Sequence, residues 1–279
     1  MMERSLQMAV QFVLEQLESL VPGAVRPESR FDKMHRALAK PTSIMPGDRE
    51  FSIVVEAIRD VRMLEFILEE LGHRTDSKFL RALTRCTQDS ALPQDDVNRS
   101  RGRDAQCELY VAAVCEKAQL APSFEEPDIQ CHVKDRRLGI AAKRLKADSQ
   151  FEKRFREGTR QIERSGIPGY IAIDITLAFH PANTPIVDVS DKKVTLAFEL
   201  ARSAFVDEYY KRMKVWLRGR DVRGLVLLDH LFIFRSPSHW ELSTFTFFVN
   251  FSPDNDGRTT EFETFQRAYM RGLSSPANT

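Results

Sequence analysis

The chain has 279 residues, of which 42% are hydrophobic and 29% are charged, and its formal net charge is +1. This is the composition of a globular protein, long enough for one large domain or two smaller ones. A net charge so near zero excludes a protein that attracts nucleic acid over its whole surface, so any basic patch must be local.

The segment MMERSLQMAVQFVLEQLESL at the start of the chain carries glutamates within its apolar pattern, which predicts a helix and not a signal peptide. The longest apolar runs, GLVLLDHLFIF and FTFFVNF, are too short to span a bilayer. The four cysteines form no CxxC pair, which favours reduced thiols. We therefore expect a soluble cytoplasmic protein with no membrane partner.

Residues 1–92 have the pattern of a helical region. Apolar residues recur every three or four positions in MAVQFVLEQLESLV and in FSIVVEAIRDVRMLEFILEELG, and Gly72 follows the second of these segments as a helix-ending residue. A shorter helix is expected in SKFLRALTRCTQ. The polar stretch DSALPQDDVNRSRGRD then predicts a linker before a second domain, residues 103–279.

The second domain is predicted to be α/β (α+β), with the element order helix, three strands, helix, strand. The helix DAQCELYVAAVCEKAQ comes first, then the strands PSFEE, DIQCHV and LGIAAKRL, the helix DSQFEKRFREGTRQIERSG and the apolar strand GYIAIDITLAF. Further elements are expected: a short strand near TPIVDVS, a helix over 194–217, strands over 223–235 and 245–252 that extend the same sheet, and a C-terminal helix with a loose tail.

Two of these helices carry charged residues of interest. Glu108 lies at the border of the apolar face of the first helix, where it points either into a cleft or along the surface. On the second helix, four cations share one side. Between Cys131 and Gly166 there are eleven Lys or Arg and five Asp or Glu, so a protein of +1 overall carries +6 here. This favours a surface that binds a polyanion over a merely solvated helix face. The candidate contacts are Lys146, Lys153, Arg156, Arg160 and Arg164.

The helix with Glu108, the sequence EPD, the sequence GIAAK and the basic helix that follows resemble the PD-(D/E)xK nuclease superfamily, which has the restriction-endonuclease-like fold. The resemblance covers about residues 103 to 177. It implies that Asp128 binds a metal ion and that Lys143 is the lysine of the motif. It further implies that Glu108 is the acid that many members carry on the helix, and that Gln161 supports the site.

The sequence departs from this motif at Ala141, where the family has an acid that alanine cannot replace as a metal ligand. Three explanations are open. The acid has moved, with Glu108 as the first substitute and Glu126 or Asp174 after it; or the site works with Glu108, Asp128 and water alone; or catalysis is lost and the fold only binds.

The leading hypothesis is a nuclease that hydrolyses DNA with Mg²⁺ or Mn²⁺ bound by Asp128 and Glu108, while Lys143 orients the attacking water. The resemblance also implies a role in bacterial restriction or defence against phage. A second hypothesis is an inactive nuclease-fold protein that binds nucleic acid or serves as an assembly subunit. A third is an interaction protein whose N-terminal helices recruit a partner. A homodimer or an operon-encoded partner would use those helices.

Overall fold

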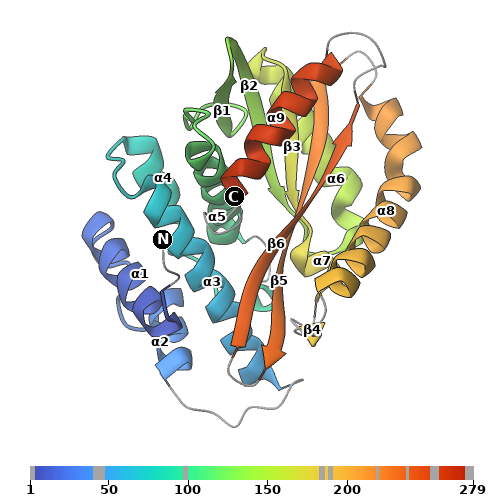
Figure 1. Cartoon of the computed structure of the whole chain (residues 1–279). Helices are drawn as coiled ribbons and strands as arrows, with labels where there is room; N and C mark the ends of the chain where they lie inside the picture. Colours follow the sequence, from blue (N-terminus) through green and yellow to red (C-terminus); the bar gives the residue numbers. More distant parts are fainter. Residues whose placement is uncertain are drawn as a thin grey trace.

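The computed structural model describes residues 4–39, 48–96, 100–181, 186–187, 191–217, 220–236, 239–251 and 258–273. The predicted loose tail lies outside these residues. The described part is mixed α/β (Figure 1). Its helices are α1 Leu6–Leu20, α2 Arg30–Ala39, α3 Arg49–Leu71, α4 Ser77–Cys86, α5 Arg101–Lys117, α6 Phe151–Ser165, α7 Thr176–Phe179, α8 Asp191–Trp216 and α9 Arg258–Leu273. Within the described ranges, no helix is long and apolar enough to cross a membrane.

One mixed sheet runs through the molecule. Its strands are β1 Ile129–Val133, β2 Arg136–Arg144, β3 Gly169–Asp174, β4 Ile186–Val187, β5 Val222–Ser236 and β6 His239–Asn250. The order is β1-β2-β3-β5-β4, with β6 paired to β5. β2, β3 and β5 are parallel to one another, whereas β1 and β6 are antiparallel to their neighbours. The prediction that the C-terminal strands extend the same sheet is confirmed.

The sheet separates two helical layers (Figure 1). On one face, apolar side chains of α5 and α9 pack on β1, β2 and β3, and α1 to α4 continue this core outward. On the other face, α6 and α8 pack on side chains of β3 and β5. β3 is buried along its whole length, as its unbroken apolar run predicts.

Three sequence predictions need correction. PSFEE is not a strand, because only Ser123 forms an isolated bridge, to Gln130, so two strands and not three separate α5 from α6. Part of the predicted linker is structured: residues 93–95 form a 3₁₀ turn, and α5 begins at Arg101. α2 was not predicted, although its buried Phe31 and Met34 are three positions apart.

The hydrophobic core is continuous across the predicted domain boundary, since one cluster joins residues of α1, α3 and α4 to residues of α5 and the sheet. A buried ionic network crosses the same boundary. Glu56 of α3 accepts from Arg59 and from Arg103 of α5 at 2.6 and 3.1 Å. Arg59 Nε in turn donates to the carbonyl of His230 on β5. Despite burial, these cations lower the pKa of Glu56 to about 2.

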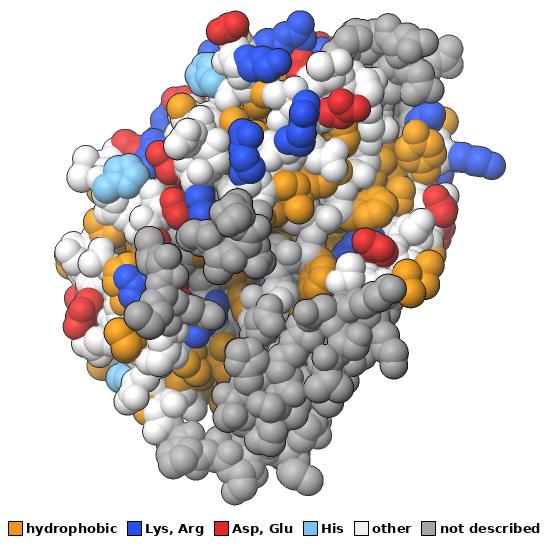
Figure 2. Space-filling model, in the orientation of Figure 1, with side chains coloured by type: hydrophobic (Ala, Val, Ile, Leu, Met, Phe, Trp, Pro, Cys, Tyr) orange, Lys and Arg blue, Asp and Glu red, His pale blue; other side chains and the backbone are white. Residues whose placement is uncertain are grey.

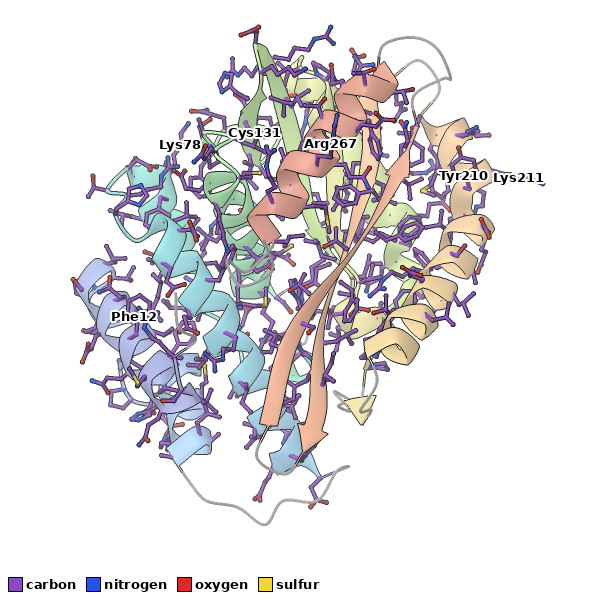
Figure 3. All side chains as sticks on the ribbon, in the orientation of Figure 1. Phe12, Lys78, Cys131, Tyr210, Lys211 and Arg267 are labelled. Atoms are coloured by element: carbon purple, nitrogen blue, oxygen red, sulfur yellow. The ribbon has the colours of Figure 1, made fainter. Side chains whose placement is uncertain are left out.

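Basic and acidic side chains are interspersed on the face shown in Figure 2, which agrees with the net charge near zero. Figure 3 shows that side chains fill the space between the ribbons of α5, α9 and the sheet. All four cysteines are free thiols, as the sequence predicts, and the structure buries all of them.

Candidate active site

Asp128 is held at the start of β1 by its neighbours on β2. The antiparallel pairing places Ile129 opposite Ile140, so Asp128 lies beside the last third of β2. Gly139 makes this approach possible: a Cβ atom there would come within 2.8 Å of Pro127 Cδ. The sequence segments EPD and GIAAK thus meet at a direct contact of Pro127 with Gly139, which has no side chain.

Three donors surround the Asp128 carboxylate. The backbone N–H of Ala142 and the ammonium of Lys143 donate to Oδ2 at 2.9 and 2.7 Å, and the amide of Gln161 donates to Oδ1 at 3.0 Å. The Asp128 side chain is only 13% exposed. Burial raises the pKa of Asp128 above its usual value, since desolvation of the carboxylate outweighs the nearby ammonium and the donated hydrogen bonds.

Lys143 lies at the end of β2 with its side chain only 11% exposed. Its ammonium donates to Asp128 and, at 2.8 Å, to the carbonyl oxygen of Ala142. An ammonium has three N–H donors, so one more is available for an incoming oxygen. The lysine at the end of an otherwise buried strand is thus paired within the cleft and is not simply extended into solvent.

Gln161 reaches the site from α6, which buries Phe151, Phe155 and Ile162 on its apolar side. Gly158 lets α6 approach β3 closely, because a Cβ atom there would lie 3.0 Å from Ile171 Cγ2. The Gln161 amide donates to Pro127 O at 2.9 Å as well as to Asp128. Its Oε1 atom is buried without a hydrogen-bond partner in the described part of the chain.

Glu108 enters from α5, on the opposite side of Asp128 from α6. It pairs with Arg85 of α4 at 3.2 Å and is 19% exposed. Burial raises the pKa of Glu108 to about 7, and the Asp128 carboxylate contributes to the rise. Two carboxylates with raised pKa values on one cleft are a frequent property of catalytic sites.

The other acids named from the sequence lie elsewhere. Asp174 pairs with Arg144 at 3.3 Å and accepts from the backbone of Thr176, so the buried charge is matched by an arginine. Glu126 pairs with Arg164, and its side chain is half exposed. Ala141 is fully buried in the apolar cluster beneath α6 and α8. Of the three suggested substitutes for the missing acid, Glu108 is the one that lines the same cleft as Asp128, Lys143 and Gln161.

A cleft of about 650 Å³ contains the four site residues Glu108, Asp128, Lys143 and Gln161. The remaining side chains on its walls are mostly charged: Asp104, Arg144, Arg154, Glu157, Arg160, Glu163 and Arg164. The structure thus brings together all four predicted catalytic residues and two of the five predicted nucleic-acid contacts.

The other three predicted contacts do not line this cleft. Lys146 donates to the carbonyl of Asp96 at 2.9 Å. Arg156 pairs with Glu152 and lies over the Trp216 ring of α8. Lys153 is exposed on α6. The row of cations predicted on α6 therefore divides, and only its C-terminal half faces the cleft.

The residues present fit a hydrated divalent cation better than a fully protein-bound one. Within the described ranges, no group of three or more His, Cys, Asp or Glu side chains gathers closely enough to hold a metal ion. Mg²⁺ typically binds one or two carboxylates and keeps several waters. Asp128, Glu108 and the unpartnered Oε1 of Gln161 offer that oxygen set, and a cation there would stabilise both carboxylates as anions.

Sequence reasoning missed the contribution of α4. Arg85 pairs with Glu108 although 23 positions separate them. Lys78, Arg81 and Arg85 recur at helical spacing, a signal that was present in the sequence. Nothing in the sequence placed this helix against the site.

Comparison of the chain with protein-family models, with curated proteins and with solved structures found no match.

Proposed function

We propose that this cleft binds the phosphodiester backbone of DNA and hydrolyses it with the help of Mg²⁺ or Mn²⁺. The observation that carries the proposal is the convergence of Glu108, Asp128, Lys143 and Gln161, from four separate elements or loops, on one cleft that Arg160 and Arg164 border. A random surface cleft seldom combines a buried Asp–Lys pair with a second carboxylate of raised pKa.

The element order α5, β1, β2, α6, β3 supports a core of the PD-(D/E)xK type. The parallel pairing of β2 with β3 places the end of β2, with Lys143, beside the end of β3. The first expected strand is reduced to the bridge at Ser123, and the acid expected at Ala141 is replaced by Glu108 of α5. In this proposal the second carboxylate thus comes from a helix instead of from the strand.

Each residue has a distinct role in the proposed reaction. When bound, a divalent cation supplies positive charge that offsets the charge of the phosphate. Asp128 and Glu108 would hold it. Lys143 donates its remaining hydrogen bond to the attacking water or to a phosphate oxygen, which stabilises developing negative charge. Gln161 orients Asp128 through its two hydrogen bonds.

The test is cleavage of supercoiled plasmid, linear duplex, single-stranded DNA and RNA with Mg²⁺, Mn²⁺ or EDTA. Lys143→Ala and Asp128→Asn should each lower the rate by at least about 100-fold, because the first removes a donor to the reacting groups and the second removes a ligand of the cation. Arg267→Gln, at an exposed position of α9, is the matched control and should cleave like the unchanged protein. Equal rates in all three variants would refute the assignment.

A second candidate is a protein that binds nucleic acid without cleaving it. Two observations favour it: Ala141 cannot bind a metal, and the Asp128–Lys143 pair occupies groups that catalysis would need. This candidate requires salt-dependent binding of DNA or RNA with no turnover under any cation. Defence against phage and a role for α1 to α4 in binding a second copy or another protein stay predictions.

A further inference from the structure

The cleft continues past the two carboxylates onto α4. A second hollow of about 680 Å³ shares Glu108 and Asp128 with the first. Its other walls come from α4 and from the segment before β1. They consist of Lys78, Arg81, Ala82, Thr84, Arg85, Phe124, Glu125 and Glu126. Asp128 and Glu108, the acidic pair, therefore lie at the junction of two hollows and not at the closed end of one.

The basic residues of α4 lie on one side of that helix. Its opposite side buries Phe79, Leu83 and Cys86, and the spacing of Lys78, Arg81 and Arg85 directs their side chains to a common exposed side. Lys78, labelled in Figure 3, pairs with Glu125 at 2.5 Å, and Arg85 pairs with Glu108. Arg81 has no carboxylate within 4.0 Å among the described residues, so its charge is unmatched there.

In the described part of the first hollow, α6 likewise carries arginines that are paired with a glutamate and one that is not. Arg164 pairs with Glu126 at 3.1 Å, and Arg160, like Arg81, has no carboxylate partner within the described ranges. Cations from α4 and from α6, helices that lie far apart in the sequence, thus flank Asp128 and Glu108 from two sides. Cations on both sides of Asp128 and Glu108 suit a polyanion that extends past them better than a single small anion.

We propose that α4 forms the second wall of the nucleic-acid site, so that the bound strand passes between α4 and α6 and crosses over Asp128 and Glu108. This inference rests on the proposed function and adds to it. It makes a region outside the predicted nuclease core part of substrate binding. It also implies a substrate with nucleotides on both sides of the phosphate that lies at Asp128.

The ion pairs now present on the two walls can yield to phosphate at little cost. Lys78 and Glu125 are each 45% exposed, and Arg85 is 51% exposed. Exposed pairs of this kind contribute little to stability, because both charges stay hydrated. Arginine binds phosphate with two parallel hydrogen bonds, so a strand can replace Glu108 as the partner of Arg85.

The experiment measures the affinity of the full chain for a fluorescent single-stranded oligonucleotide and for its duplex over a range of salt concentrations. Mg²⁺ is present, and the substrates carry a non-hydrolysable backbone. Arg81→Gln tests α4, Arg160→Gln tests α6, and Arg267→Gln on α9 is the matched control. All three arginines are exposed, so the substitutions leave the fold intact, which circular dichroism and thermal melting would verify.

We expect Arg81→Gln and Arg160→Gln each to weaken binding several-fold. Each should also lower the slope of log affinity against log salt by about 0.7 for a single strand. The double variant should show the sum of both changes. Arg267→Gln should bind like the unchanged protein.

Two results would overturn the inference in different ways. If Arg160→Gln weakens binding while Arg81→Gln matches the control, α4 is not part of the site, but the proposed function stands. If neither variant differs from Arg267→Gln, or the unchanged protein does not bind, the proposed function loses its binding surface together with this inference.

Discussion

Replacing Glu108 by glutamine should stabilise the protein above neutral pH. Burial raises the pKa of Glu108 from 4.5 to about 7, so the folded protein binds this proton more tightly than the unfolded chain does. The resulting stability is complete below the unfolded pKa and is lost as the pH rises through the folded pKa. A shift of that size corresponds to at most about 3 kcal/mol, since one pKa unit equals about 1.4 kcal/mol.

Glutamine has the shape of the neutral acid and avoids this loss. The variant gives up the pair with half-exposed Arg85, which offsets about 1 kcal/mol of the gain. We expect Glu108→Gln to raise the free energy of unfolding by about 2 kcal/mol near pH 8 and by almost nothing near pH 4. Urea denaturation monitored by circular dichroism at both pH values measures the difference.

An exposed glutamate on α9 provides the control. Glu263→Gln should change the free energy of unfolding by no more than about 0.5 kcal/mol at either pH. If Glu108→Gln has the same effect at both pH values, Glu108 does not ionise near neutrality, and the argument from burial is wrong.

Three further predictions concern packing, charge and thiols. Gly139→Val should cost about 1–3 kcal/mol and abolish any cleavage, because the new side chain displaces Pro127 and with it Asp128; unchanged stability in a urea titration would contradict the described contact. Asp229→Asn should lower the free energy of unfolding by about 3 kcal/mol, since it leaves Arg202, 3.0 Å away and 3% exposed, without a charge partner; a thermal shift no larger than that of Glu263→Gln would refute this. No thiol should react with a bulky disulfide reagent until the protein unfolds, because all four cysteines are buried and burial raises the pKa of Cys86 to about 12; rapid labelling of the folded protein would contradict the burial.

Periodic patterns predicted most of the elements but not all of their surroundings. The apolar run of β3 was enough to predict that strand, because the strand is buried along its whole length as its own sequence indicates. α5 was predicted to have one apolar face, yet almost every side of it is buried. The polar residues Arg103 and Gln106 are buried too, because Glu56 and Arg30 of other helices provide their partners. Such pairs depend on tertiary contacts that no local pattern reports.

The residues of the candidate site were likewise predicted only in part. Asp128, Lys143 and Gln161 could be named from the sequence because EPD, GIAAK and the helix after them resemble a known nuclease motif. Arg85 could not, since α4 reaches Glu108 only through the packing of α4 against α5. The sequence left open which acid replaces the one missing at Ala141. In the structure Glu108 lines the cleft that holds Lys143 and Gln161, whereas Glu126 pairs with Arg164 and Asp174 pairs with Arg144.

The ionic network between α3 and α5 joins the two halves of the chain through buried charges. A fragment that starts at residue 103 would keep Arg103 and lose Glu56, its buried counter-charge. The removal of one member of a buried pair typically costs about 3–5 kcal/mol, a large share of the stability of an ordinary domain. Attempts to produce the sheet half alone should therefore give insoluble protein. Sequence changes in α3 should therefore also alter the position of Glu108, because α3 packs against the helix that carries it.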